Sequence, residues 1–162
     1  MTSLAGLNHD FRDLLLAFVE EGVEFLAIGA YALALHGAPR ATGDLDVFVR
    51  ATQENAARVW RALIAFGASL VAAEVRPEDF ATAGMVYQIG LPPRRIDVLT
   101  TISGLLFEEA WATRERPVLD GTEIAFIGRE AFLQNKLATG RAKDLADVER
   151  LQGKPPSPRR NG

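Results

Sequence analysis

The chain contains no cysteine, and this absence excludes disulfide bridges, thiolate metal sites and cysteine nucleophiles. It has only two histidines, His9 and His36, which are too few for a histidine metal centre. No apolar run approaches the roughly 20 residues that a membrane-spanning helix requires, so we expect no membrane partner. The beginning of the chain also lacks the basic and then apolar segments of a secretion signal, which makes a cytoplasmic location the default expectation.

An excess of basic charge is missing as well. The 18 lysines and arginines are outnumbered by 21 acidic residues, giving a net charge of −3. Composition therefore does not predict a broad nucleic-acid surface, although a local basic patch remains open. The 162 residues are 48% hydrophobic and 24% charged, as in ordinary globular proteins. We expect a single domain over residues 1–152, followed by a disordered tail, rich in proline and arginine, over 153–162.

Hydrophobic periodicity and turn signals predict alternating helices and strands. The expected helices cover residues 8–21, 29–36, 52–67, 103–115, 129–140 and 141–152, with Asn8, Thr52 and Ser103 as candidate N-caps. The expected strands cover residues 23–28, 44–50, 85–90 and 94–100, with a hairpin around Asp120-Gly121 within 117–128. This order indicates an α/β or α+β domain with a mixed sheet flanked by helices and a helical C-terminus.

One stretch, ATGDLDVFVR (41–50), places two carboxylates on one face of an expected strand. Side chains alternate across a strand, so Asp44 and Asp46 point to the same side, while the apolar residues between them point to the core. Two carboxylates so close repel each other unless a proton or a cation lies between them. The stretch therefore predicts a bound cation.

A third carboxylate, Asp97 in RIDVL, lies on another expected strand between two apolar positions. If that strand is the neighbour of the first, Asp44, Asp46 and Asp97 converge. Such a cluster suits a hard divalent cation, Mg²⁺ or Mn²⁺, that also binds phosphate oxygens. We therefore expect Mg²⁺ carried in with a nucleoside triphosphate. Arg94 and Arg95 alternate in direction beside Asp97, so at most one of them faces the acids.

Several further residues admit two interpretations. Gly29 ends a strand and begins a helix, which suits either a close approach to phosphate or a tight turn alone. Arg40 precedes the acids and suits phosphate binding or an exposed loop. Lys136 could reach into a cleft or extend along the surface. Asp144 could hold Lys136 or Arg141 in place.

Three other features favour structural roles. Lys143 and Asp147 are four residues apart on a helix and are interpreted as a solvated pair. His36 ends a helix and is interpreted as a C-terminal cap. Trp60 and Trp111 fall within helical apolar patterns and are predicted to be core residues.

The segment IGAYALALHGAPRATGDLDVFV resembles the signature of nucleotidyltransferases of the DNA polymerase β superfamily. In that signature a glycine after a strand is followed by an Asp-x-Asp pair and later by a third acid. The ending NKLATGRAKDLADVERL resembles the C-terminal helices of small bacterial members, including the AbiEii toxin-like group of toxin–antitoxin systems. The chain departs from the pattern at Ala30, where many members carry serine or glycine.

The resemblance implies a nucleotidyltransferase fold and a set of roles for individual residues. Asp44 and Asp46 would hold Mg²⁺ on the triphosphate, and Asp97 would share a metal ion and help to deprotonate the acceptor hydroxyl. The candidate nucleotide-binding residues are Gly29, Ala30, Arg40 and Lys136. The reaction would move a nucleoside monophosphate to an acceptor that could be a tRNA end, a protein or a small molecule, with a cognate partner protein as a further expectation.

Two alternatives use the same residues differently. Phosphatases with a nucleophilic Asp-x-Asp pair carry it at the end of an apolar strand, whereas here the apolar run follows the acids. The other alternative is a module on the same fold that binds a nucleotide or a protein partner with little or no turnover, which Ala30 keeps open.

Overall fold

The computed structural model describes residues 8–41, 43–91 and 94–153. Its elements are α1 (His9–Glu20), β1 (Phe25–Ile28), α2 (Ala30–Leu35), β2 (Asp44–Val49), α3 (Gln53–Phe66), the 3₁₀ helix η2 (Pro77–Ala81), β3 (Val86–Ile89), β4 (Arg95–Leu99), α4 (Phe107–Ala112), β5 (Val118–Leu119), β6 (Thr122–Glu123), α5 (Arg129–Thr139) and α6 (Ala142–Leu151). Apart from Gly153, the predicted tail lies outside the described residues.

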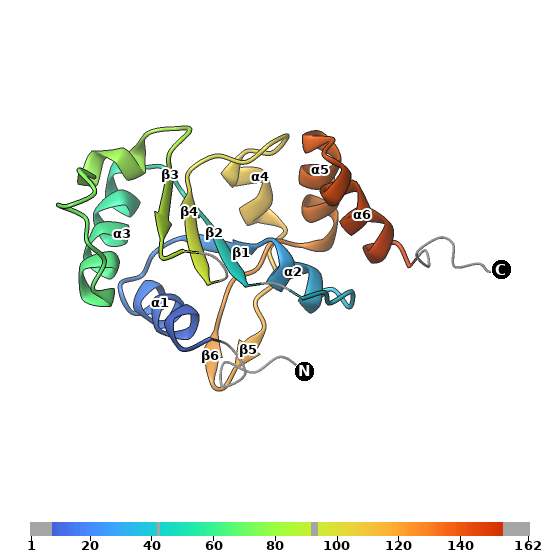
Figure 1. Ribbon diagram of the computed structural model, residues 1–162, viewed down its shortest axis with the longest axis horizontal. Coiled ribbons are helices and arrows are strands. Elements are labelled where there is room, and N and C mark those ends of the chain that lie inside the picture. The colour runs from blue at the N-terminus through green and yellow to red at the C-terminus, as the bar shows by residue number, and fades with distance from the viewer. Residues whose placement is uncertain (1–7, 42, 92–93, 154–162) are drawn as a thin grey trace.

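The centre of the molecule is a four-stranded mixed sheet in the order β1-β2-β4-β3. The two central strands, β2 and β4, are parallel, and each outer strand is antiparallel to its neighbour. Helices α1 and α3 lie on one side of the sheet, and α4, α5 and α6 lie on the other (Figure 1). The expected mixed sheet flanked by helices is therefore confirmed.

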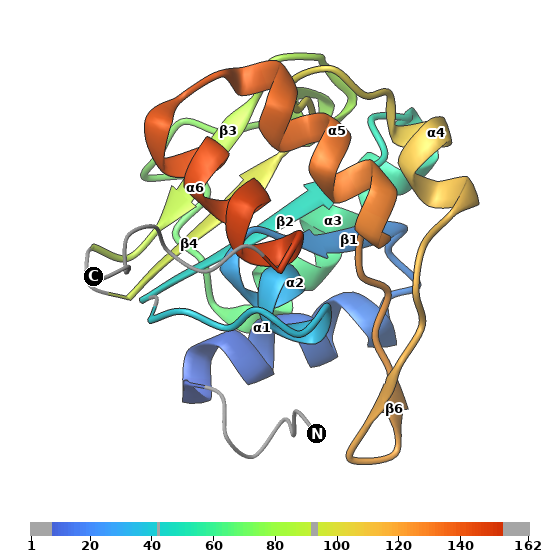
Figure 2. The same ribbon diagram turned by 90° about the vertical axis from the view of Figure 1, so that its right-hand side faces the viewer.

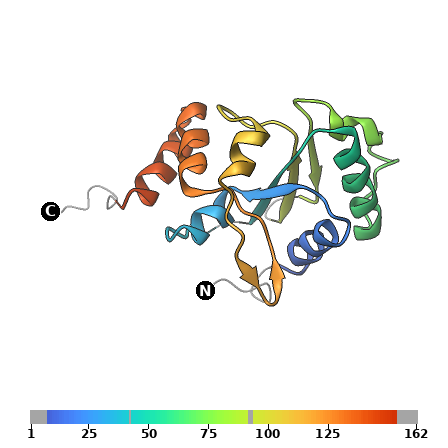
Figure 3. The same cartoon turned by 180° about the vertical axis from the view of Figure 1, so that it is seen from behind.

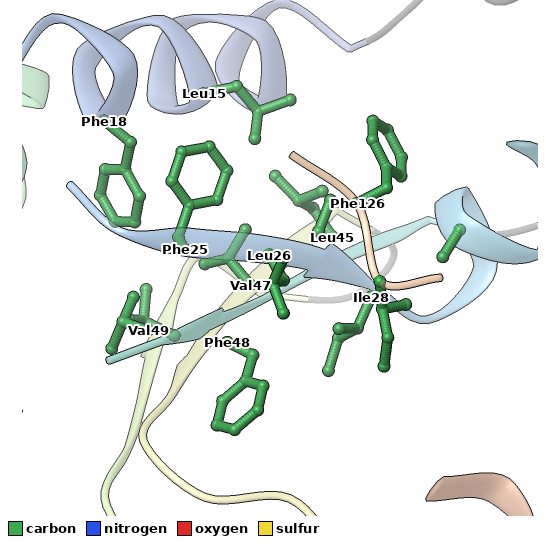
Figure 4. Close-up of a cluster of buried hydrophobic side chains, with 14 of the residues drawn as sticks. Leu15, Phe18, Phe25, Leu26, Ile28, Leu45, Val47, Phe48, Val49 and Phe126 are labelled. Carbon is green, nitrogen blue, oxygen red and sulfur yellow. The ribbon is translucent and has the colours of Figure 1, made fainter. Parts of the chain in front are cut away.

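The core lies on both sides of the sheet. Phe48 of β2 packs against Phe107 of α4 on one side, and another part of the core fills the side that faces α1 and α3. Leu45, Val47 and Val49 of β2 are buried there, as the alternation along the strand predicts. Figure 4 shows α1 packed over β1, with the ring of Phe18 against Phe25 at a centroid distance of 5.3 Å. Because apolar side chains hold this face of β2, the acids between them project from the opposite face.

Side-chain caps begin two of the helices, α1 and α3, at the predicted residues. The Asn8 side chain accepts a hydrogen bond from the Asp10 amide at the start of α1, and Thr52 caps α3 in the same way. The predicted cap at Ser103 is wrong. Helix α4 begins only at Phe107, where the Glu109 side chain accepts a hydrogen bond from the Leu106 amide. Residues 103–106 thus form a loop, and its first residue, Ser103, lines the cleft described below.

The predicted hairpin at Asp120-Gly121 is confirmed, although β5 and β6 are only two residues long. It projects from the body of the molecule, as Figures 2 and 3 show. Beyond it, the chain returns along the outer edge of β1, where the Ala27 amide donates to the Ala125 carbonyl at 2.9 Å. This contact covers a sheet edge that would otherwise expose unpaired backbone groups. No helix in the described ranges combines the length and apolar character needed to cross a membrane.

Candidate active site

The two central strands bring the three predicted aspartates onto one face of the sheet. Asp44 and Asp46 lie on β2, and Asp97 lies on β4 directly beside Asp46 in the parallel register. Asp44 is paired in the same way with Arg95. Register partners point to the same side of a sheet, so these four charged side chains form one cluster.

This cluster lies in a cleft of about 590 Å³ between the sheet and helices α5 and α6. The sheet supplies the acids, Arg95 and a few apolar side chains, and the loop after β4 supplies hydroxyl groups. The α5–α6 side contributes the cations Lys136, Arg141 and Lys143. The cleft therefore has an acidic wall facing a wall that carries basic groups.

Gly29 forms the floor of the cleft beside the acids. Its φ of +71° lies in the left-handed region that favours glycine. A Cβ atom on Gly29 would lie only 2.7 Å from Oδ2 of Asp46. The glycine is therefore required both by the backbone turn and by the space that the carboxylate occupies. The predicted neighbour Ala30 is buried in the first turn of α2 and is not among the side chains that line the cleft.

The surroundings of the acids favour protonation or a bound cation. Burial, followed by the charges of Asp97 and Asp44, raises the pKa of Asp46 to about 6. Burial also raises the pKa of Asp97, against the opposing effect of Arg95. Ionisation of Asp46 and Asp97 is therefore unfavourable in the empty cleft, and a bound cation would offset that cost.

Arg95 takes the position between two of the three acids. Its Nε lies 3.1 Å from Oδ1 of Asp97, and its Nη2 lies 3.6 Å from Oδ2 of Asp44. Within the described ranges, no three acidic or histidine side chains converge as a ready-made set of metal ligands. Of the two arginines beside Asp97, only Arg95 faces the acids, as the alternation predicts; Arg94 is exposed and does not line the cleft.

Lys136 projects into the cleft from α5 and is held there by two buried acids. Its Nζ lies 3.1 Å from Oδ1 of Asp144 and 3.6 Å from Oδ2 of Asp147, and only 12% of its side chain is exposed. Lys136 is thus a fixed, nearly buried ammonium group that faces the acid cluster, and the alternative of a surface lysine is wrong.

Asp144 is the anchor of this wall. It holds both Lys136 and Arg141, the two partners between which the sequence did not decide. Although burial by itself favours the protonated form, hydrogen bonds from Thr139 and Lys136, the charge of Lys136 and a hydrogen bond from Arg141 lower the pKa of Asp144 to about 2. The carboxylate therefore remains charged at all physiological pH values and fixes both cations.

Searches against protein-family models and against curated proteins give no match. Solved structures do match. A candidate nucleotidyltransferase of Thermotoga maritima has a TM-score of 0.55 at 16% identity over 89% of this chain and 91% of its own. The lincosamide antibiotic adenylyltransferase LnuA, bound to lincomycin, has a TM-score of 0.52 at 12% identity over 91% and 98%. A nucleotidyltransferase-like antigen of Paracoccidioides brasiliensis reaches 0.50 at 12% over 88% and 74%.

The chain has a nucleotidyltransferase fold. The three structures share that architecture with it over nearly its whole length. At these identities the likeness establishes the fold alone, so the roles of the residues rest on the geometry of the cleft.

Arg40, for which phosphate binding and an exposed loop position both stayed open, pairs with Asp147 and is not among the residues that line the cleft. Its guanidinium forms two hydrogen bonds with Asp147, at 2.8 and 3.1 Å. Asp147 is buried, so the predicted solvated pair of Lys143 and Asp147 is wrong. Arg40 and Asp147 instead connect the loop before β2 to α6, which positions the basic wall relative to the acids. The sequence contained a signal for the burial of Asp147, because Asp144, Asp147 and the apolar Leu151 share one face of the helix.

The remaining residues singled out from the sequence have structural surroundings. His36 is the C-cap residue of α2, and its Nε2 lies 2.8 Å from the Ile127 carbonyl oxygen. Trp60 and Trp111, predicted to be core residues, are partly buried and pack against the edge of the core. Sequence reasoning missed Thr139, whose hydroxyl donates to Asp144 at 2.7 Å. Thr139 lines the cleft, whereas His36, Trp60 and Trp111 do not.

Proposed function

We propose that this protein is a metal-dependent nucleotidyltransferase that moves a nucleoside monophosphate from a nucleoside triphosphate to an acceptor hydroxyl and releases pyrophosphate. One observation carries the proposal: Asp44, Asp46 and Asp97 share a face of two adjacent parallel strands and face the basic wall of the same cleft. A triphosphate with its divalent cation has both kinds of charge, and this cleft is complementary to both.

The residues fit a Mg²⁺ or Mn²⁺ ion. Mg²⁺ in proteins commonly takes one or two carboxylates and completes its shell with phosphate oxygens and water, so a closed set of protein ligands is not required. The raised pKa of Asp46 and the guanidinium beside Asp97 both indicate that the cluster favours a positive charge. Asp44, Asp46 and Asp97 would hold the ion, which would neutralise charge on the triphosphate and polarise the reacting phosphate.

The chain's own groups would supply the rest of the chemistry. Asp97, with its raised pKa, would accept the proton of the acceptor hydroxyl as that oxygen attacks the α-phosphate. Lys136 would bind the departing pyrophosphate from the opposite wall, held in place by Asp144 and Asp147. Gly29 would keep the floor open beside Asp46.

The acceptor is proposed only by its chemical group, a hydroxyl on a tRNA end, a protein or a small molecule. A small-molecule acceptor has support from LnuA, an adenylyltransferase of similar fold whose structure contains lincomycin. A place in a toxin–antitoxin system, with a cognate partner protein, has support only from the likeness of the C-terminal helices to those of the AbiEii group.

A binding module with weak or no turnover is the second candidate. Two observations favour it. Arg95 pairs with the carboxylates that a metal ion would have to bind, and Ala30 offers no hydroxyl to a phosphate. Binding without transfer of a labelled group would support this candidate over the enzyme.

The test incubates the protein with each of the four nucleoside triphosphates, labelled in separate reactions at the α- or the γ-phosphate, together with Mg²⁺ and a cell extract. We expect label from the α-phosphate, and not from the γ-phosphate, to enter an acceptor, with pyrophosphate released in equal amount. Label that enters an acceptor from the γ-phosphate, and does so only when this protein is added, would indicate a kinase and would contradict the proposal.

The matched variants are Asp44→Asn and Asp13→Asn. The first removes a carboxylate from the cleft, and the second removes the same charge from α1, far from it. Transfer should fall by a factor on the order of 100 or more in Asp44→Asn and remain at the parent's level in Asp13→Asn. Equal transfer by both variants would remove the acid cluster from the mechanism.

A further inference from the structure

The position of Arg95 has a consequence for the order in which the cleft accepts its ligands. Its guanidinium pairs with Asp97 and reaches Asp44, and 31% of the side chain is exposed. A bound metal ion would need the same carboxylate oxygens. The metal ion and the guanidinium are therefore competitors for one set of acids.

The cleft offers the guanidinium no alternative anion. Among the described side chains that line it, the only acids are Asp44, Asp46 and Asp97, and the other charged groups are the cations Lys136, Arg141 and Lys143. If a metal ion alone displaced Arg95, the guanidinium would exchange a carboxylate for surroundings that repel it. A triphosphate changes this balance, because it brings anionic oxygens into the same cleft that a guanidinium can bind in a bidentate manner.

We propose that Arg95 is a built-in counter-ion of the acid cluster, which makes the cleft accept a divalent cation together with a triphosphate and reject the cation alone. On binding of the complex, the guanidinium moves from the carboxylates to the phosphate oxygens. This inference rests on the proposed function, since it concerns the same ligands, and it makes Arg95 a specificity-determining residue for the metal–triphosphate complex.

The experiment measures Mn²⁺ binding to the nucleotide-free protein by the electron paramagnetic resonance of free Mn²⁺. Arg95→Gln is compared with the parent and with Arg94→Gln, which removes the same charge from the neighbouring exposed position outside the cleft. We expect Arg95→Gln to bind Mn²⁺ alone about tenfold more tightly than the parent and Arg94→Gln to match the parent. Arg95→Gln should also melt at a lower temperature than the parent and regain stability on addition of Mn²⁺ alone.

The second arm repeats the titration with a non-hydrolysable triphosphate analogue. In the parent, the analogue should strongly increase the affinity of the protein for Mn²⁺. In Arg95→Gln this increase should be much smaller, and it should approach what the binding of Mn²⁺ to the analogue itself accounts for. If the gain is as large in Arg95→Gln as in the parent, and Mn²⁺ alone binds no better, the inference is overturned while the proposed function stands. If the analogue binds none of the proteins, the proposed function fails, and the first arm still decides the role of Arg95.

Two further variants test whether Mn²⁺ binds at the acid cluster and replace Arg95→Gln if it does not fold. In Arg95→Gln/Asp97→Asn the extra Mn²⁺ affinity should disappear, because the site loses a carboxylate; if it persists, Mn²⁺ is bound elsewhere and the inference is wrong. Should Arg95→Gln not fold, Arg95→Lys keeps a positive charge but cannot span two acids. It should bind Mn²⁺ alone more tightly than the parent, and equal affinity would contradict the inference.

Discussion

Gly29 and Asp46 are in such close contact that a methyl group on the glycine would lie 2.7 Å from the carboxylate oxygen Oδ2. The contact joins the turn after β1 to the acid cluster on β2. We therefore expect Gly29→Ala to displace the Asp46 carboxylate and to weaken binding of a Mg²⁺–triphosphate complex at least tenfold. Because φ at this position is +71°, the variant should also lose about 1 kcal/mol or more of folding stability.

The control for this variant is Gly67→Ala. Gly67 ends α3 with a φ of +97°, and a Cβ there would meet no atom within 4 Å. Both variants should lose stability in urea unfolding, but only Gly29→Ala should lose nucleotide binding in calorimetry. Unchanged binding in Gly29→Ala would show that the carboxylate can move without consequence, and that the glycine serves the turn alone.

Asp46→Asn should stabilise the empty protein at neutral pH. The pKa of Asp46 is about 6 in the fold, against 3.8 as its ordinary value, so its ionisation opposes folding. This opposition is absent below pH 3.8, grows between pH 3.8 and 6, and is complete above pH 6. The difference of about two pKa units corresponds to up to about 3 kcal/mol.

Urea unfolding at pH 4 and at pH 8, in the presence of a chelator, tests this expectation. The stabilisation by Asp46→Asn should be clear at pH 8 and nearly absent at pH 4. The variant should also lose most of the stabilisation that the parent gains from Mg²⁺ and nucleotide. A variant that is less stable than the parent at pH 8 yet keeps its full response to ligand would assign Asp46 to the fold and not to the chemistry.

The sequence was sufficient to predict the elements that place the acids. Alternation along β2 and β4 put Asp44, Asp46 and Asp97 on the polar face, and turn signals located the connections, since both depend on residues close together in the chain. It did not predict the charge pairs between segments that are distant in the chain. Arg40 and Asp147 are 107 positions apart, and their contact depends on how α6 docks against the loop before β2.

The same limit explains the errors at the basic wall. Lys143 and Asp147 have the spacing of a surface ion pair. They do not form one, because Asp147 is buried and pairs with Arg40 and Lys136 instead. The position of Arg95 between Asp44 and Asp97 likewise required the register of two strands that are far apart in the sequence. Local patterns therefore located the groups, and tertiary packing selected their partners.

Asp144→Asn should have the opposite effect on stability to Asp46→Asn. The pKa of Asp144 is about 2 in the fold, so its ionised form stabilises the protein above pH 3.8, and this contribution is lost as the pH falls through 2. At pH 7 we expect a loss of about 2 kcal/mol, since the charge that fixes Lys136 and Arg141 is removed. Urea unfolding should show the loss at pH 7 and a smaller one at pH 3, whereas a constant difference would mean that packing, not charge, sets its size.

Asp97→Asn should separate catalysis from binding. If Asp97 accepts the proton of the acceptor hydroxyl, its work is done in the transition state, so kcat should fall by a factor on the order of 100 to 10,000. The amide keeps the shape of the carboxylate and leaves Asp44 and Asp46 in place, so nucleotide affinity with Mg²⁺ should change only a few-fold. Steady-state kinetics of α-phosphate transfer and calorimetry of nucleotide binding measure the two effects separately, with Asp13→Asn as the control for charge. If affinity falls as much as kcat, Asp97 serves mainly to hold the metal ion. If neither changes, Asp97 is a structural partner of Arg95, and another group must accept the proton.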